Sequence, residues 1–147
     1  MYTHICTHTY IYACIQVRVV VLQLDIEGFT KLSTSMPHLA LAECINALFS
    51  EFDDAVIGRD LFKLDTIGDA YILVGWLPKE EEEEDADLHG ASVEGGWDEG
   101  RRRAIEKQQA VERTCSNVLA VAAAMIRAVR QHSLHVEQPL SARIGIR

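Results

Sequence analysis

The chain lacks both a long hydrophobic run and a basic stripe. Its longest apolar stretch, Val17 to Leu24, is interrupted by Arg18 and Gln23 and is far too short to span a bilayer. Its only dense basic cluster is the run of three arginines at 101–103, which is too small for an electrostatic footprint of nucleic acid. We therefore expect neither a membrane anchor within these residues nor a nucleic-acid partner.

Cysteine is also scarce, and the four residues form no CxxC pair: Cys6, Cys14, Cys44 and Cys115. A disulfide scaffold of the secreted type needs a much higher density, so the pattern indicates a reducing compartment. We expect a cytoplasmic protein, or the cytoplasmic domain of a larger protein, with Cys44 and Cys115 packed as small apolar side chains.

The charge is uneven, because ten of the 22 acidic residues lie between 79 and 100, where Lys79 is the only base. The whole chain carries a net charge of −8 with 48% apolar residues, and its 147 residues fit one globular domain. Residues 79–113 combine the Glu run, four glycines and the arginine cluster. We predict that they form a long disordered acidic insertion, since such a segment buries too little apolar area to offset its ordering entropy.

The first fifteen residues, MYTHICTHTYIYACI, have an unusual low-complexity composition. Every one can be encoded by codons that alternate purine and pyrimidine, as in a translated dinucleotide repeat. We interpret 1–15 as an artefactual leader and 16–147 as the folded domain. The segment fits a signal peptide poorly, and its His4, Cys6 and His8 lack the second ligand pair of a metal site.

From residue 16 onward the hydrophobic pattern predicts six elements in the order β-α-β-β-α-β. A nearly continuous apolar strand at 16–26 suits burial on both faces. Helical spacing follows from just after Pro37 to just before Gly58, then a tight hairpin of strands at 61–66 and 70–75, a helix from about 115, and a strand at 140–146. This is the α+β, ferredoxin-like order, with the helices on one face of the sheet.

Two aspartates are the strongest candidates for chemistry. Asp25 ends the first strand and Asp69 follows the hairpin turn, so pairing of these strands would bring the carboxylates together. Two carboxylates with a backbone carbonyl suit Mg²⁺ or Mn²⁺, and phosphate oxygens would complete the coordination shell of the ion. The backbone N–H groups of Gly28, Phe29 and Thr30 could cradle those phosphates. The alternative is that each aspartate only caps a turn.

Several motifs together resemble class III nucleotidyl cyclases. LDIEGFT at 24–30 resembles the D-I-x-G-F-T motif, and FKLDTIGDAY at 62–71 resembles the K-x-x-T-I-G-D-A-Y hairpin. Leu77-Pro78 matches the usual exit from that hairpin, and RIGI at 143–146 resembles the R-I-G-I strand of the family. The G-G-D/E-E/F turn of a diguanylate cyclase is missing, since the hairpin reads Ile67-Gly68-Asp69-Ala70. The resemblance covers about 16–78 and 114–147.

The resemblance implies conversion of GTP or ATP to a 3′,5′-cyclic nucleotide in intracellular signalling. Asp25, Asp69 and the carbonyl of Ile26 would hold two Mg²⁺ or Mn²⁺ ions, and Gly28, Phe29 and Thr30 would bind phosphates. Family members work as head-to-tail homodimers or heterodimers. Asp65 occupies the base-reading position, where an acceptor-only carboxylate suits guanine, so we favour GTP over ATP.

The family pattern continues beyond Arg147 with the transition-state Asn and Arg, so no catalytic residue is assignable within 1–147. We therefore expect a truncated cyclase domain that is inactive alone. Two alternatives remain: an adenylate cyclase, and a non-catalytic cyclase-homology module that dimerises or binds nucleotide.

Overall fold

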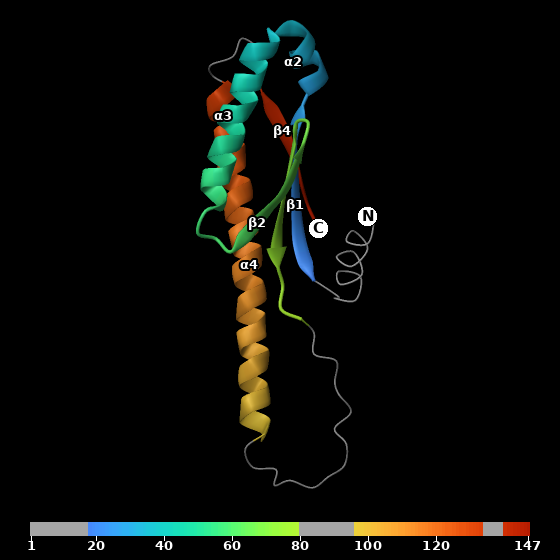
Figure 1. Cartoon of the computed structure of the whole chain (residues 1–147). Helices are drawn as coiled ribbons and strands as arrows, with labels where there is room; N and C mark the ends of the chain where they lie inside the picture. The colour runs from blue at the N-terminus through green and yellow to red at the C-terminus, as the bar shows by residue number, and fades with distance from the viewer. Residues whose placement is uncertain (1–17, 80–95, 134–139) are drawn as a thin grey trace, which may run out of the picture.

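The computed structural model describes residues 18–79, 96–133 and 140–147. They form one four-stranded antiparallel sheet in the order β2-β3-β1-β4, with three helices (Figure 1). The predicted α+β class and ferredoxin-like order are confirmed. The elements are β1 (Val19–Glu27), α2 (Phe29–Ser35), α3 (His38–Val56), β2 (Leu61–Ile67), β3 (Ala70–Trp76), α4 (Gly96–Ser133) and β4 (Ser141–Ile146).

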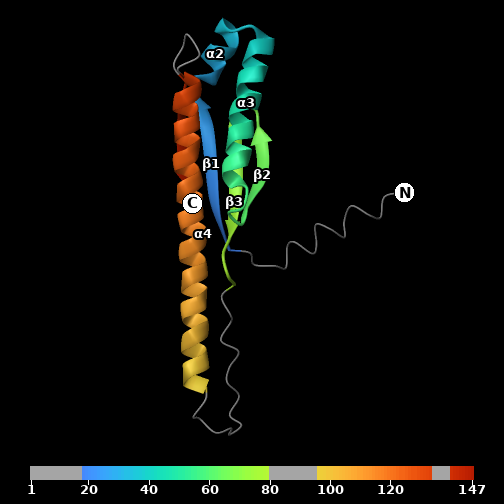
Figure 2. The same cartoon turned by 90° about the vertical axis from the view of Figure 1, so that its left-hand side faces the viewer.

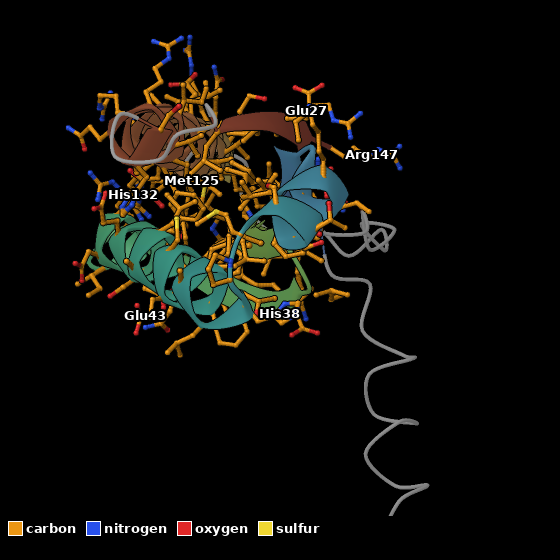
Figure 3. The ribbon with its side chains drawn as sticks, turned by 90° about the horizontal axis from the view of Figure 1, so that it is seen from above. Glu27, His38, Glu43, Met125, His132 and Arg147 are labelled. Carbon is orange, nitrogen blue, oxygen red and sulfur yellow. The ribbon has the colours of Figure 1, made fainter. Side chains whose placement is uncertain are left out.

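Helices α3 and α4 run side by side over one face of the sheet, as predicted (Figure 2). No described element covers the other face, which we call the open face. The core lies between the helices and the sheet, and Figure 3 shows Met125 of α4 facing α3 there. The largest fully buried side chains are Tyr71, Phe52, Leu22, Leu24, Ile26, Leu48, Leu73, Met125, Val118 and Val121.

Strand β1 is buried on one face only, which corrects the expectation of burial on both. Leu22, Leu24 and Ile26 are buried against the helices, whereas Gln23 between them is exposed. The apolar run suggested burial on both faces because the valines at 19–21 occupy both faces of the strand. All three are in fact half-buried. Asp25 therefore stands on the open face, in the same row as Gln23.

A short helix, α2, precedes the predicted long helix and was not itself predicted. Gly28 begins it with a φ of 75°, a left-handed conformation that suits glycine. Met36 ends it in an extended conformation, φ −105° and ψ 148°, as expected of a residue before proline. Pro37 caps the start of α3, so only Met36 and Pro37 separate the two helices.

Helix α4 begins at Gly96, about twenty residues before the predicted start. Residues 96–113, expected to be disordered, are helical, and this half of α4 extends past the end of the sheet (Figure 1). Interactions between side chains four residues apart stabilise this part of the helix, and the expectation of disorder considered only buried apolar area. They are Arg103 with Glu99 at 2.8 Å, Arg102 with Glu106 at 3.8 Å, and Gln108 with Glu112 at 2.9 Å. The leader at 1–15 and the Glu run at 80–84 lie outside the described residues.

Candidate metal and nucleotide site

The register of the sheet brings Asp25 and Asp69 to the same end of neighbouring strands. Asp25 of β1 is opposite Ala70 of β3, and Asp69 directly precedes Ala70. Antiparallel partners and one peptide step place the two aspartate Cα atoms within roughly 9 Å of each other. Both residues are half-buried, so their carboxylates can face a ligand from solvent while part of each is shielded from water.

A second strand contributes an opposite charge beside Asp25. Arg143 of β4 is opposite Asp25 in the register, and its Nη2 lies 3.2 Å from Asp25 Oδ2. The side chain of Arg143 is 71% exposed and that of Asp25 40% exposed, so the pair is solvated and weak. A cation approaching Asp25 would compete with this guanidinium, and the pairing was not foreseen from the sequence.

The donor set fits a hard divalent cation that keeps part of its shell for another ligand. Asp25 and Asp69 supply carboxylate oxygens, and Ile26, next to Asp25, lies one residue beyond the last β1–β3 pair. No group of three or more His, Cys, Asp or Glu side chains could hold a metal ion within the described residues. Mg²⁺ is bound in proteins by one or two carboxylates plus substrate phosphates, which matches two aspartates and a carbonyl.

The segment after Asp25 offers unused backbone donors. The carbonyl of Gly28 accepts from the amides of Lys31 and Leu32, both at 3.0 Å. In the described part of the chain the amides of Phe29 and Thr30 have no acceptor. A Cβ at position 28 would meet nothing within 4 Å, so the glycine is explained by its φ of 75° rather than by crowding within this chain.

Asp65 stands on the open face because the register of β2 is irregular. It is opposite Ile72, which in turn is opposite the exposed Gln23. A shift between Lys63 and Asp65 leaves Leu64 as the extra residue of a β-bulge. Asp65 is exposed, and its Oδ1 accepts from the amide of Thr66 at 2.7 Å, which leaves its other oxygen available.

The open face therefore carries Asp25 and Asp65 together with apolar side chains. Phe62, Leu64 and Trp76 are 54–56% exposed on β2 and β3. On the β1–β4 side an open depression of about 740 Å³ is lined by Val21, Gln23, Asp25, Arg143, Gly145, Ile146 and Arg147. Figure 3 shows Glu27 and Arg147 at this side of the molecule, away from α3.

A polar cluster on the helix side was missed by the sequence analysis; we call Asp53, Lys63 and Tyr71 the Asp53 cluster. Lys63 Nζ lies 2.8 Å from Asp53 Oδ1, and the Tyr71 hydroxyl donates to the same oxygen at 2.6 Å. Burial opposes ionisation of Asp53, but the bonds from Lys63 and Tyr71 outweigh it and lower the Asp53 pKa. Burial, and then the bond to Asp53, raises the pKa of Tyr71.

Comparison with known families identifies the domain to which these features belong. The profile of the adenylate and guanylate cyclase catalytic domain matches residues 11–147. The chain belongs to this family. The match includes residues 11–15, which the sequence analysis had assigned to the leader.

Curated relatives are similar over a short part of their length. The chain is 41% identical over 56 residues to a receptor-type guanylate cyclase, gcy-23, of Caenorhabditis elegans, covering 38% of this chain and 5% of that protein. It is 38% identical over 69 residues to the soluble guanylate cyclase subunit alpha-1 of Canis lupus familiaris, covering 47% and 9%. The chain thus spans a small fraction of these relatives.

Solved structures share the fold at low sequence identity. The adenylyl cyclase CyaB from P. aeruginosa gives a TM-score of 0.60 at 17% identity, covering 90% of this chain and 57% of that one. The guanylate cyclase domain of RhGC from Catenaria anguillulae, in complex with GTP, gives 0.52 at 21%, covering 87% and 54%. None of the described helices is long and apolar enough to cross a membrane.

Proposed function

We propose that this domain, in the protein to which it belongs, forms a 3′,5′-cyclic nucleotide from a nucleoside triphosphate, with GTP preferred. The observation that carries the proposal is the register that makes Asp25 and the residue after Asp69 direct partners on β1 and β3. Family membership supports the reaction class, and the relatives named as guanylate cyclases support GTP.

In this mechanism Asp25, Asp69 and the Ile26 carbonyl would hold two Mg²⁺ or Mn²⁺ ions. When bound, such ions neutralise the triphosphate and lower the pKa of the attacking ribose 3′-hydroxyl. The amides of Phe29 and Thr30, with that of Gly28, donate to phosphate oxygens, since the first two have no acceptor in the described part of the chain. Arg143, which contacts Asp25, would compete with a metal ion for that carboxylate.

Asp65 distinguishes the bases by hydrogen bonding. Its carboxylate accepts from the N1–H and N2–H₂ of guanine, whereas N1 of adenine is an acceptor and needs a donor. The free oxygen of Asp65 and its position on the open face support this role. A Lys at this position would reverse the preference.

The working unit is a head-to-tail dimer, either of two copies or with another cyclase domain. The open face supports this arrangement, because it carries the metal candidate Asp25 and the base-reading candidate Asp65 beside exposed apolar residues such as Phe62 and Trp76. The non-canonical dimeric guanylyl cyclase domain of a fusion protein from Blastocladiella emersonii has the same fold, at a TM-score of 0.51 and 23% identity. We propose that this dimer lies on the cytoplasmic side of the cell.

The test is the product formed by the full-length protein with Mn·GTP, Mg·GTP and Mn·ATP. Asp25→Asn and Asp69→Asn keep side-chain shape and remove charge, so the protein should fold while turnover falls by about 10²-fold or more. Asp54→Asn is the matched control, since Asp54 is an exposed aspartate of α3 on the far side of the core. A folded Asp25→Asn or Asp69→Asn variant with unchanged turnover would reject the two-metal assignment.

Base reading has its own test in the same assay. Asp65→Lys should leave the Mn²⁺ dependence intact and shift the ratio of kcat/KM for GTP over ATP towards ATP. An unchanged ratio would show that Asp65 does not read the base, while leaving the cyclase assignment in place.

A further inference from the structure

We propose that the Asp53–Lys63 ion pair is a specificity-positioning device: it keeps the Lys63 ammonium on the helix side of the sheet, away from Asp65. The inference rests on the proposed function, in which Asp65 reads the base. Lys63 and Asp65 are only two residues apart in β2, yet the structure places them on opposite faces. That separation is the observation to be explained.

In a regular strand, residues two apart point to the same side of the sheet. Lys63 is opposite the fully buried Leu73, on the helix side, whereas Asp65 is opposite Ile72 on the open face. The bulge at Leu64 makes this possible by adding one residue between the two rows. Without the bulge, Lys63 would stand beside Asp65 and could pair with it.

Hydrophobicity alone specifies the bulged register weakly. A slip of residues 61–63 by one position would remove the bulge, turn Phe62 inward in place of Leu61 and turn Lys63 outward. Phe62 is 55% exposed and Leu61 half-buried, so the exchange would bury one large apolar side chain in place of another. Strand β2 is also an edge of the described sheet, so no second neighbour fixes its register.

The Asp53 cluster fixes the register of β2 that apolar burial specifies only weakly. Lys63 Nζ lies 2.8 Å and 2.9 Å from the two carboxylate oxygens of Asp53, and 5.0 Å from the centroid of the Tyr71 ring. Asp53 is held in turn by the Tyr71 hydroxyl at 2.6 Å. Because α3 carries Asp53 and β3 carries Tyr71, the cluster ties Lys63 to the helix side from two elements.

The consequence is electrostatic. With Lys63 held inward, Asp65 presents an unneutralised carboxylate that accepts from guanine. With Lys63 turned outward, the ammonium would pair with Asp65 and offer a donor to adenine N1. Asp53 and Lys63 are therefore positioning residues that act through Asp65 rather than groups that touch the base.

The experiment compares three variants in the full-length protein: Asp53→Asn, Lys63→Met and the double variant. Asp53→Asn frees the ammonium, so the GTP/ATP ratio of kcat/KM should fall by about fivefold, the scale of one exposed charge pair. Lys63→Met keeps an unbranched side chain but removes the charge, so the double variant should regain most of the wild-type ratio. Circular dichroism confirms folding, and hydrogen exchange at 61–65 reports the slip independently of turnover.

The GTP/ATP ratio separates positioning from a merely structural role, because a structural defect lowers turnover with both nucleotides and does not favour one base over the other. An unchanged ratio in folded Asp53→Asn, or a double variant no better than Asp53→Asn, would overturn the proposal. Asp65→Ala distinguishes the two levels of the argument. If Asp65→Ala leaves the ratio unchanged, base reading by Asp65 fails and this inference fails with it. If Asp65→Ala changes the ratio, the results for Asp53→Asn and the double variant decide the positioning role.

Discussion

Arg143 Nη2 lies 3.2 Å from Asp25 Oδ2, directly across the β1–β4 pair, so the leading metal-ligand candidate already has a cationic neighbour. A divalent cation at Asp25 would compete with this guanidinium for the carboxylate. The charge of Arg143 on β4 should therefore affect the affinity of Asp25 for a metal ion.

Removing this competitor should strengthen metal binding. We expect Arg143→Met to raise the affinity for Mn²⁺ by up to about fivefold, because an exposed pair contributes at most about 1 kcal/mol. Isothermal titration of the purified protein with MnCl₂ measures the change. Arg147→Met is the matched control: it removes the same charge from the same depression without a contact to Asp25. Equal gains in both variants would point to net charge and contradict the competition.

A side chain at Gly75 of β3 should be crowded and should destabilise the fold. An added Cβ would lie 2.6 Å from Thr114 Cγ2 and 2.9 Å from Leu61 Cδ2, where α4 and β2 close over the strand. We expect Gly75→Ala to lower the free energy of unfolding by about 1–3 kcal/mol through overpacking. Gly100→Ala is the control, because a Cβ there meets nothing within 4 Å and alanine favours the helix. Urea denaturation of both variants tests this, and equal midpoints would contradict the close contact.

The Asp53 cluster should make stability depend on acid pH. Contacts with Lys63 and Tyr71 lower the Asp53 pKa below its ordinary value of 3.8, despite the opposing effect of burial. A lowered carboxyl pKa stabilises the fold above the unfolded-state pKa, and this contribution is lost as the pH falls through the folded-state pKa. The wild type should therefore exceed Asp53→Asn in stability at neutral pH, with the difference vanishing in acid.

Urea midpoints measured from pH 7 down to about pH 2 follow this difference. Lys63→Met should lose the larger part of the same pH-dependent increment, because it removes both the hydrogen bond and the charge of Lys63 but leaves the bond from Tyr71. A difference between wild type and Asp53→Asn that stays constant over this range would show that ionisation of Asp53 contributes nothing to stability.

The sequence predicted the elements whose pattern follows burial. Helix α3 was bounded correctly by Pro37 and Gly58, and the hairpin around Gly68 was bounded to within a residue. Half of α4 was missed because Glu99–Arg103 and its neighbours stabilise a helix through local pairs without burial. Periodicity has no access to that kind of support.

The candidate site, too, was predictable only in part. The nearness of Asp25 and Asp69 could be anticipated, because an antiparallel neighbour brings a strand end beside a hairpin turn. The inward placement of Lys63 could not, because it depends on a single extra residue in β2 and on an acid ten positions away in α3. Strict alternation of side chains along β2 would place Lys63 on the open face beside Asp65, whereas the structure places Lys63 on the helix side.

The most direct test of the account is Mn²⁺ binding measured by electron paramagnetic resonance on the purified protein in the presence of GTP. The account predicts saturable binding that is weakened by about tenfold or more in both Asp25→Asn and Asp69→Asn, since each removes one charged oxygen ligand. Asp54→Asn should bind as the wild type does. Binding that is unchanged in either of the first two variants would contradict the central claim that Asp25 and Asp69 form one divalent-cation site.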